Sequence, residues 1–143
     1  MRNLNQRPRG SEGGGYSGNN SSRPPVLFDK KILSEGIKEI NLCREWGHFL
    51  AEGNEKVKTT QIRKFFGAVK KIQADFDQSK SEIVLLNPKL AYAVGRNKNS
   101  KVKDLYIVLS PLIDEIGEDK DRFKNFVNIF EAIVAYHKEI SGE

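Results

Sequence analysis

Lysine and arginine are the side chains of this 143-residue chain whose types and spacing could do chemistry, and that chemistry is the binding of a polyanion. Residues 54–71 carry six bases against one acid, and residues 96–103 carry four bases and no acid. Residues 113–143 carry eight acids against four bases, so the net charge of +5 is unevenly distributed. We therefore expect one anion-seeking face, and nucleic acid is the leading candidate for the anion because the bases span two segments.

Residues 59–76 combine an apolar stripe and a basic stripe on one predicted helix. The apolar positions recur at the three- and four-residue spacing of a helical face: Ile62, Phe65, Phe66, Val69, Ile72 and Phe76. The bases fall on the opposite face: Arg63, Lys64, Lys70 and Lys71. This pattern predicts a helix that packs its apolar side on a core and offers its cations to an anion, with a solvated lysine face as the ordinary alternative.

Residues suited to catalysis or metal binding are few. His137 lies on an apolar stripe, His48 has no partner nearby in sequence, and Cys43 lies on an apolar helical face. A single cysteine excludes an internal disulfide and argues against a four-ligand zinc site. The carboxylate pairs near residues 75–77 and 114–115 point to different helix faces, and no phosphate loop, dinucleotide fingerprint or nucleophile motif is present. We expect no enzyme activity, no cofactor and no metal.

Composition divides the chain near residue 25. Residues 1–25 are rich in Gly, Ser, Asn, Pro and Arg, which predicts a disordered tail, and residues 26–143 predict a single helical domain. Neither an apolar run of transmembrane length nor a signal peptide is present, so we expect a soluble cytoplasmic protein without a membrane partner.

Apolar spacing after residue 25 predicts an all-α fold, a compact bundle of about five helices with short loops. The first helix is expected from Asp29 to about Glu52, and the second from Thr59 or Thr60 to about Ser79. The third should run from Ser81 or Glu82 to Gly95, with a kink or a restart at Asn87 before Pro88. The fourth should begin at Ser100, with a kink or break at Pro111, and Asp119 should cap the fifth.

Several blocks of this helical region resemble the small helical subunit of type III-A CRISPR–Cas effector complexes, the Csm complexes. The blocks are TTQIRKFF (59–66), AYAVGR (91–96) with VKDL (102–105) close behind, and FEAIVAYHK (130–138). Their order and approximate spacing match that family, and together they span nearly the whole region from about residue 29 onward. Residues 1–25 and the run 97–101 are not part of the resemblance.

The resemblance implies a five-helix bundle whose copies line up in a filament beside the backbone subunits that hold the guide RNA. It implies contacts with the target RNA and the guide–target duplex without cleavage, which belongs to the backbone and large subunits. The residues that it places in these contacts are Arg63, Lys64, Arg96 and Lys103. Charge position alone adds Lys56, Lys58, Lys70, Lys71, Lys98 and Lys101. Arg63 also has a competing interpretation, as the partner of an acid on another helix.

The basic loops themselves contain no aromatic residue, so we expect backbone contacts with little sequence preference. Two other functions fit the sequence. A stand-alone helical nucleic-acid-binding protein would select a duplex DNA sequence. A purely structural scaffold would use its lysines only for solubility and would tolerate reversal of their charge.

Overall fold

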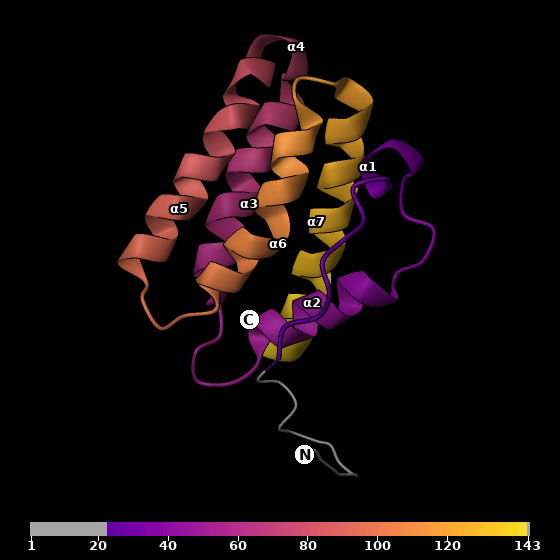
Figure 1. Ribbon diagram of the computed structural model, residues 1–143. Helices are drawn as coiled ribbons and strands as arrows, with labels where there is room; N and C mark the ends of the chain where they lie inside the picture. Colours follow the sequence, from indigo (N-terminus) through magenta and orange to yellow (C-terminus); the bar gives the residue numbers. More distant parts are fainter. Residues whose placement is uncertain (1–22, 143) are drawn as a thin grey trace, which may run out of the picture.

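The structure is a computed structural model that describes residues 23–142, and these residues form an all-α bundle (Figure 1). No strand occurs in this part of the chain, which confirms the predicted fold class. Within it, five helices have eleven or more residues and three elements are shorter. In chain order the elements are α1 (Ile32–Glu35), α2 (Asn41–Ala51), α3 (Thr59–Ala74), α4 (Phe76–Ser79), the 3-10 helix η2 (Lys80–Leu85), α5 (Leu86–Arg96), α6 (Val102–Ile116) and α7 (Lys120–Ser141).

The described residues test two further expectations only in part, the disordered tail and the absence of a membrane-spanning segment. The predicted tail, residues 1–25, lies outside them except for residues 23–25, so its disorder stays a prediction. None of the helices in residues 23–142 combines the length and the apolar character that crossing a membrane requires.

Helix α7 is the central element of the core, because its apolar side chains are buried along its length. Phe123, Phe126 and Phe130 are at most 1% exposed, and successive ring centroids are 6.2 Å apart. Phe65 of α3 lies 5.6 Å from Phe130, and Phe76 of α4 lies 5.6 Å from Phe123, centroid to centroid. Aromatic pairs at such separations add about 0.5–1.5 kcal/mol to the burial of their area. The predicted apolar stripe of residues 62–76 is therefore confirmed as the side of the helix that faces the core.

Helix α2 approaches α7 very closely at Gly47. A Cβ atom at this position would lie 2.6 Å from the Cβ of Tyr136 and 2.7 Å from the carbonyl oxygen of Ile133. The backbones can come this near only because glycine has no side chain. Next to it, the fully buried Trp46 donates its Nε1–H to the carbonyl of Val26 at 2.8 Å, which fastens the segment before α1.

The continuous helix predicted from Asp29 to about Glu52 is wrong, because α1 and α2 are separate. Gly36 follows α1 with a φ of +82°, a left-handed conformation that ends the helix. The Asn125 side chain of α7 donates to the Leu33 carbonyl at 2.6 Å and so satisfies one of the open carbonyls at the end of α1. A partner 92 residues away thus supports the break, and local periodicity does not reveal that partner.

The second predicted helix differs at both ends. Lys58, rather than Thr59 or Thr60, is the N-cap of α3, and its backbone N–H donates to the Gln61 side chain at 2.8 Å. Thr59 is instead buried. Asp75 leaves the helical region (φ −141°, ψ 61°), so α3 ends before it and the short elements α4 and η2 follow.

The two prolines inside helical segments behave differently. Helix α5 begins at Leu86, one residue before the restart expected at Asn87, and Pro88 occupies its first turn, where a missing N–H costs nothing. Of the kink or break expected at Pro111, the break does not occur, because helix α6 continues through this residue. The carbonyl deprived of its partner there belongs to Ile107, whose side chain is 45% exposed, so solvent lies close by.

The predicted cap of the last helix is confirmed. Asp119 accepts the backbone N–H of Arg122 at 2.9 Å through its Oδ1 atom, one turn into α7. Such a cap satisfies one of the open N–H groups of the first turn and contributes about 1 kcal/mol.

Replacing Gly47 with alanine should destabilise the fold by about 1–3 kcal/mol or more, because the added methyl group meets backbone atoms of α7 that cannot move independently. Gly67→Ala is the matched control: Gly67 lies inside α3 with nothing within 4 Å of an added Cβ, so the same change should stabilise by about 0.5–1 kcal/mol. Urea unfolding measures both values. Equal effects from the two substitutions would contradict the close approach of α2 and α7.

Candidate nucleic-acid interface

Nine of the ten side chains predicted to contact nucleic acid are exposed. They are Lys56, Lys58, Arg63, Lys64, Lys70, Lys71, Arg96, Lys98 and Lys103. Within residues 23–142, none of the nine has a carboxylate within ion-pair distance, so the alternative that Arg63 pairs with an acid of another helix is not realised there. Exposed cations with no carboxylate at ion-pair distance are available to attract an external anion.

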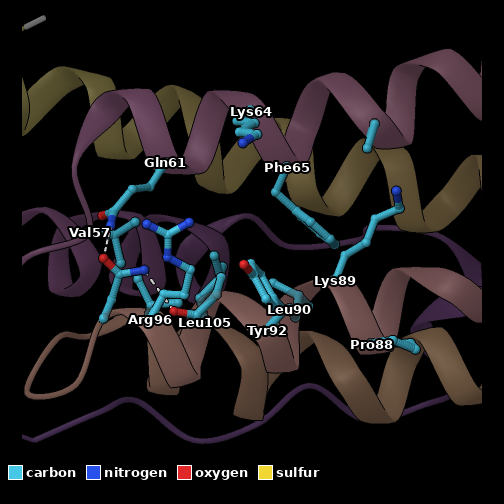
Figure 2. Close-up of a pocket in the computed structure, with 14 residues that line it drawn as sticks. Val57, Gln61, Lys64, Phe65, Pro88, Lys89, Leu90, Tyr92, Arg96 and Leu105 are labelled. Atoms are coloured by element: carbon cyan, nitrogen blue, oxygen red, sulfur yellow. Dashed lines mark hydrogen bonds between the residues drawn. The ribbon is translucent and has the colours of Figure 1, made fainter.

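A groove of about 660 Å³ separates α3 from α5 and carries cations on both walls (Figure 2). Lys64 lines it from α3, and Lys89 and Arg96 extend toward α3 from α5. Its floor is apolar and includes the buried Phe65 and Leu90. No residue of the acidic C-terminal segment lines the groove, so its rim keeps a positive charge.

Hydrogen bonds between two amide side chains hold one end of this groove. Gln61 of α3 donates through Nε2 to Oδ1 of Asn97 at 2.8 Å, and Asn97 donates through Nδ2 to the Ala93 carbonyl at 2.7 Å. The Oε1 atom of Gln61 accepts the backbone N–H of Lys58 at the start of α3. The beginning of α3 and the end of α5 are thereby joined, and this places Lys64 and Arg96 on the same groove.

The remaining cations are not gathered at the groove. Lys70 and Lys71 lie about two turns beyond Lys64 along α3. Lys98 and Lys103 belong to the connection between α5 and α6 and to the start of α6, and neither lines the groove. Of the exposed cations predicted to form one anion-seeking face, Lys64 and Arg96 therefore share the groove, and these four are spread along α3 and the α5–α6 connection.

Lys101 requires a correction, because its side chain is not a surface cation. It is 8% exposed, and its Nζ donates to the carbonyls of Phe49 and Glu52 at 2.8 and 2.9 Å. The ammonium also lies 4.0 Å from the centroid of the Phe49 ring. Burial lowers the pKa of Lys101, while the nearby carboxylates of Glu52, Asp104 and Glu55 act in the opposite direction. Lys101 therefore has a structural role, because it donates hydrogen bonds to carbonyls at the C-terminal end of α2.

Two residues of the groove were missed from the sequence, Lys89 and Tyr92. Tyr92 is 68% exposed and lines the groove, and the Arg96 guanidinium carbon lies 5.8 Å from its ring centroid. An aromatic residue four positions before an arginine on a helix is a local signal for such a pair. The two basic loops contain no aromatic residue, but α5 carries Tyr92 one turn before Arg96.

The candidates for catalytic chemistry have structural partners. His137 is buried and its Nε2 lies 2.6 Å from the Val57 carbonyl, as its apolar position predicted, and His48 lies 2.8 Å from the Glu139 carboxylate. Cys43 is buried, and burial, with a smaller contribution from Glu39, raises the pKa of its thiol to about 11. Residues 23–142 contain no group of three or more His, Cys, Asp or Glu placed to hold a metal ion.

Comparison with known proteins gives one match. A family model described as "Csm2 Type III-A" matches residues 36–143, which include all the helices from α2 onward. No curated protein and no solved structure matches the chain.

Replacing Lys101 with methionine should lower the free energy of unfolding by about 1–3 kcal/mol, because the carbonyls of Phe49 and Glu52 lose a buried donor. The control is Lys98→Met, which removes an exposed lysine of the same connection and should change stability by less than about 0.5 kcal/mol. Urea unfolding of both variants tests the assignment. A Lys101→Met variant that is as stable as the parent but binds nucleic acid less tightly would show that Lys101 contacts nucleic acid after all.

Proposed function

Because the chain belongs to the Csm2 Type III-A family, and is therefore a small subunit of a type III-A CRISPR effector complex, we propose that it holds the RNA of that complex by its backbone. The RNA is the target strand and its duplex with the guide RNA. The contacts come from the exposed cations of α3, the α2–α3 and α5–α6 connections and the end of α5. They hold the strand in place and thereby stabilise the filament.

The observation that carries this proposal is the pairing of Lys64 and Arg96 across one groove, without a carboxylate partner for either among the described residues. An acid in hydrogen-bonding reach would have neutralised each cation and reduced its attraction for phosphate. When cations that are free of such partners neutralise phosphates, the counterions condensed along the RNA are released, and this release is the main source of backbone affinity.

The proposed subunit does no chemistry on the RNA. Support comes from the occupied or buried state of the groups best suited to acid–base or nucleophilic work, since His137 contacts a backbone carbonyl, His48 a carboxylate, and the Cys43 thiol is buried with a raised pKa. Cleavage then belongs to other subunits of the complex.

The proposed protein partners are the backbone and large subunits and further copies of this chain. Val84 and Leu85, adjacent in η2, are 68% and 50% exposed, and they provide an apolar surface at the opposite end of α5 from Arg96. An apolar surface at this position would contact protein while the cations face RNA.

Alanine at both Lys64 and Arg96 should weaken RNA binding roughly tenfold at low salt and make the logarithmic salt slope less negative by about 1.4, because two single-strand phosphate contacts are lost. Fluorescence anisotropy with the isolated protein measures both quantities. In the assembled complex the same variant should retain less target RNA.

The matched control is alanine at Lys120 and Lys124, two exposed lysines of α7 that remove the same charge outside the groove. We expect this pair to bind RNA like the parent. If the two double variants weaken binding equally, net charge rather than a positioned surface is responsible. If neither does, the subunit is a scaffold.

Purified protein should not cut RNA or DNA when magnesium, manganese or zinc is added, because no described side chain is arranged for acid–base or metal-assisted hydrolysis. Gel analysis of end-labelled strands over several hours tests this expectation. Metal-dependent cleavage that one Asp, Glu or His substitution abolishes would contradict the proposed role.

A further inference from the structure

Backbone binding leaves one feature of the groove unused, the exposed ring of Tyr92. This side chain is 68% exposed on the α5 wall, and the guanidinium of Arg96 lies over its ring at 5.8 Å (Figure 2). A tyrosine so far out of the core contributes little to folding. Its ring instead offers an aromatic surface to whatever enters the groove.

The groove beside Tyr92 has the size and the chemistry of a ligand site. Its volume of about 660 Å³ falls within the roughly 300–1,000 Å³ of small-molecule sites in proteins. Its floor is built from buried apolar side chains, among them Phe65, Leu90 and Leu105. Its rim carries cations from both walls. An occupant that fits this arrangement has a flat apolar body attached to anionic groups.

We propose that the groove receives one unpaired base of the RNA strand, stacked on the ring of Tyr92, while the neighbouring phosphates lie against Lys64, Lys89 and Arg96. This inference rests on the proposed function, because the strand must first be held by the cations. It adds a base-binding subsite to a surface otherwise expected to contact only the backbone.

Charge favours a nucleotide over the other occupants of an apolar groove. No acidic residue lines it, so three cations define the potential at its rim. The N-terminal residues 1–25 of the same chain carry four arginines against one glutamate and would be repelled. A neutral apolar helix of a protein partner would fill the floor but would leave the three cations without anionic partners.

The polar groups of the groove give the subsite little base preference. Gln61 and Asn97 are its amide side chains, and they bond to each other and to the backbone of Lys58 and Ala93. Reading a base edge needs donors and acceptors that are free to contact it. The subsite therefore distinguishes a base from no base, and it accepts any of the four.

The test compares two short strands of equal length on the full chain, a uridine oligonucleotide and a strand in which every nucleotide is abasic. The uridine strand should bind roughly five- to a hundredfold more tightly, because only it offers a ring to stack. Tyr92→Ala should reduce this preference to near unity, whereas Tyr92→Phe should retain it. Ile107→Ala removes another exposed hydrophobic side chain, outside the groove, and should leave the preference unchanged.

A second variant, Ala68→Leu, fills the groove while leaving its three cations in place. It should lose the preference for the uridine strand and keep the parent's salt slope, with thermal melting confirming the fold. A single 4-thiouridine in the strand should crosslink to the peptide that contains Tyr92.

The outcomes separate this inference from the function beneath it. Equal affinity of the parent for both strands, with binding that still depends on Lys64 and Arg96, overturns the base subsite and leaves the backbone function intact. If neither strand shows salt-dependent binding, the proposed function itself is contradicted. Displacement of both strands by a neutral apolar peptide would assign the groove to a protein partner and overturn the subsite.

Discussion

The buried Lys101 joins the end of α2 and the α2–α3 connection to the basic α5–α6 connection. Its Nζ donates to the carbonyls of Phe49 and Glu52 at the end of α2, and its backbone N–H donates to the Glu55 carbonyl at 2.7 Å. Because Lys101 directly follows the basic loop after α5, these bonds fix that loop against the α2–α3 connection. Burial of a charge is costly, and here carbonyl acceptors and nearby carboxylates offset the cost. The buried Lys101 thus fixes the loop that carries the exposed cations before it.

The α2–α3 connection is held from a second side by α7. His137 contacts the Val57 carbonyl, and the Val57 N–H donates to the Leu50 carbonyl at 2.8 Å. The start of α3 is therefore fixed before its side chains meet α5, and the Gln61–Asn97 bond completes the arrangement. Polar contacts at this end and aromatic packing along α7 hold the fold, and none of the nine exposed cations predicted to bind nucleic acid forms an ion pair with a described carboxylate. Those cations are accordingly available to an anion from outside.

Prediction from the sequence succeeded where one local pattern decides the outcome and failed where a distant partner does. Apolar periodicity located the five long helices because each buries one face on a common core. It missed the break at Gly36, which a side chain of α7 stabilises, and the burial of Lys101, whose acceptors lie some fifty residues away. The groove itself, with Tyr92 and Lys89 on its wall, arises only when α3 and α5 pack together. No pattern within a single segment reports that juxtaposition, so these two residues could not be selected by charge clustering alone.

Under the proposed function, the pairing of Gln61 with Asn97 would let one surface serve strands of any sequence. In an RNA-guided complex, base pairing with the guide selects the target, so a subunit that met the target with free amides would compete with that selection. Here the amides that could read a base are bonded to each other, and what remains exposed is charge and a single ring. Charge attracts every phosphate and a ring stacks with every base, which makes both contacts blind to sequence. In the proposed role, the same hydrogen bond that joins the start of α3 to the end of α5 would therefore also occupy the amides with which the groove could discriminate between targets.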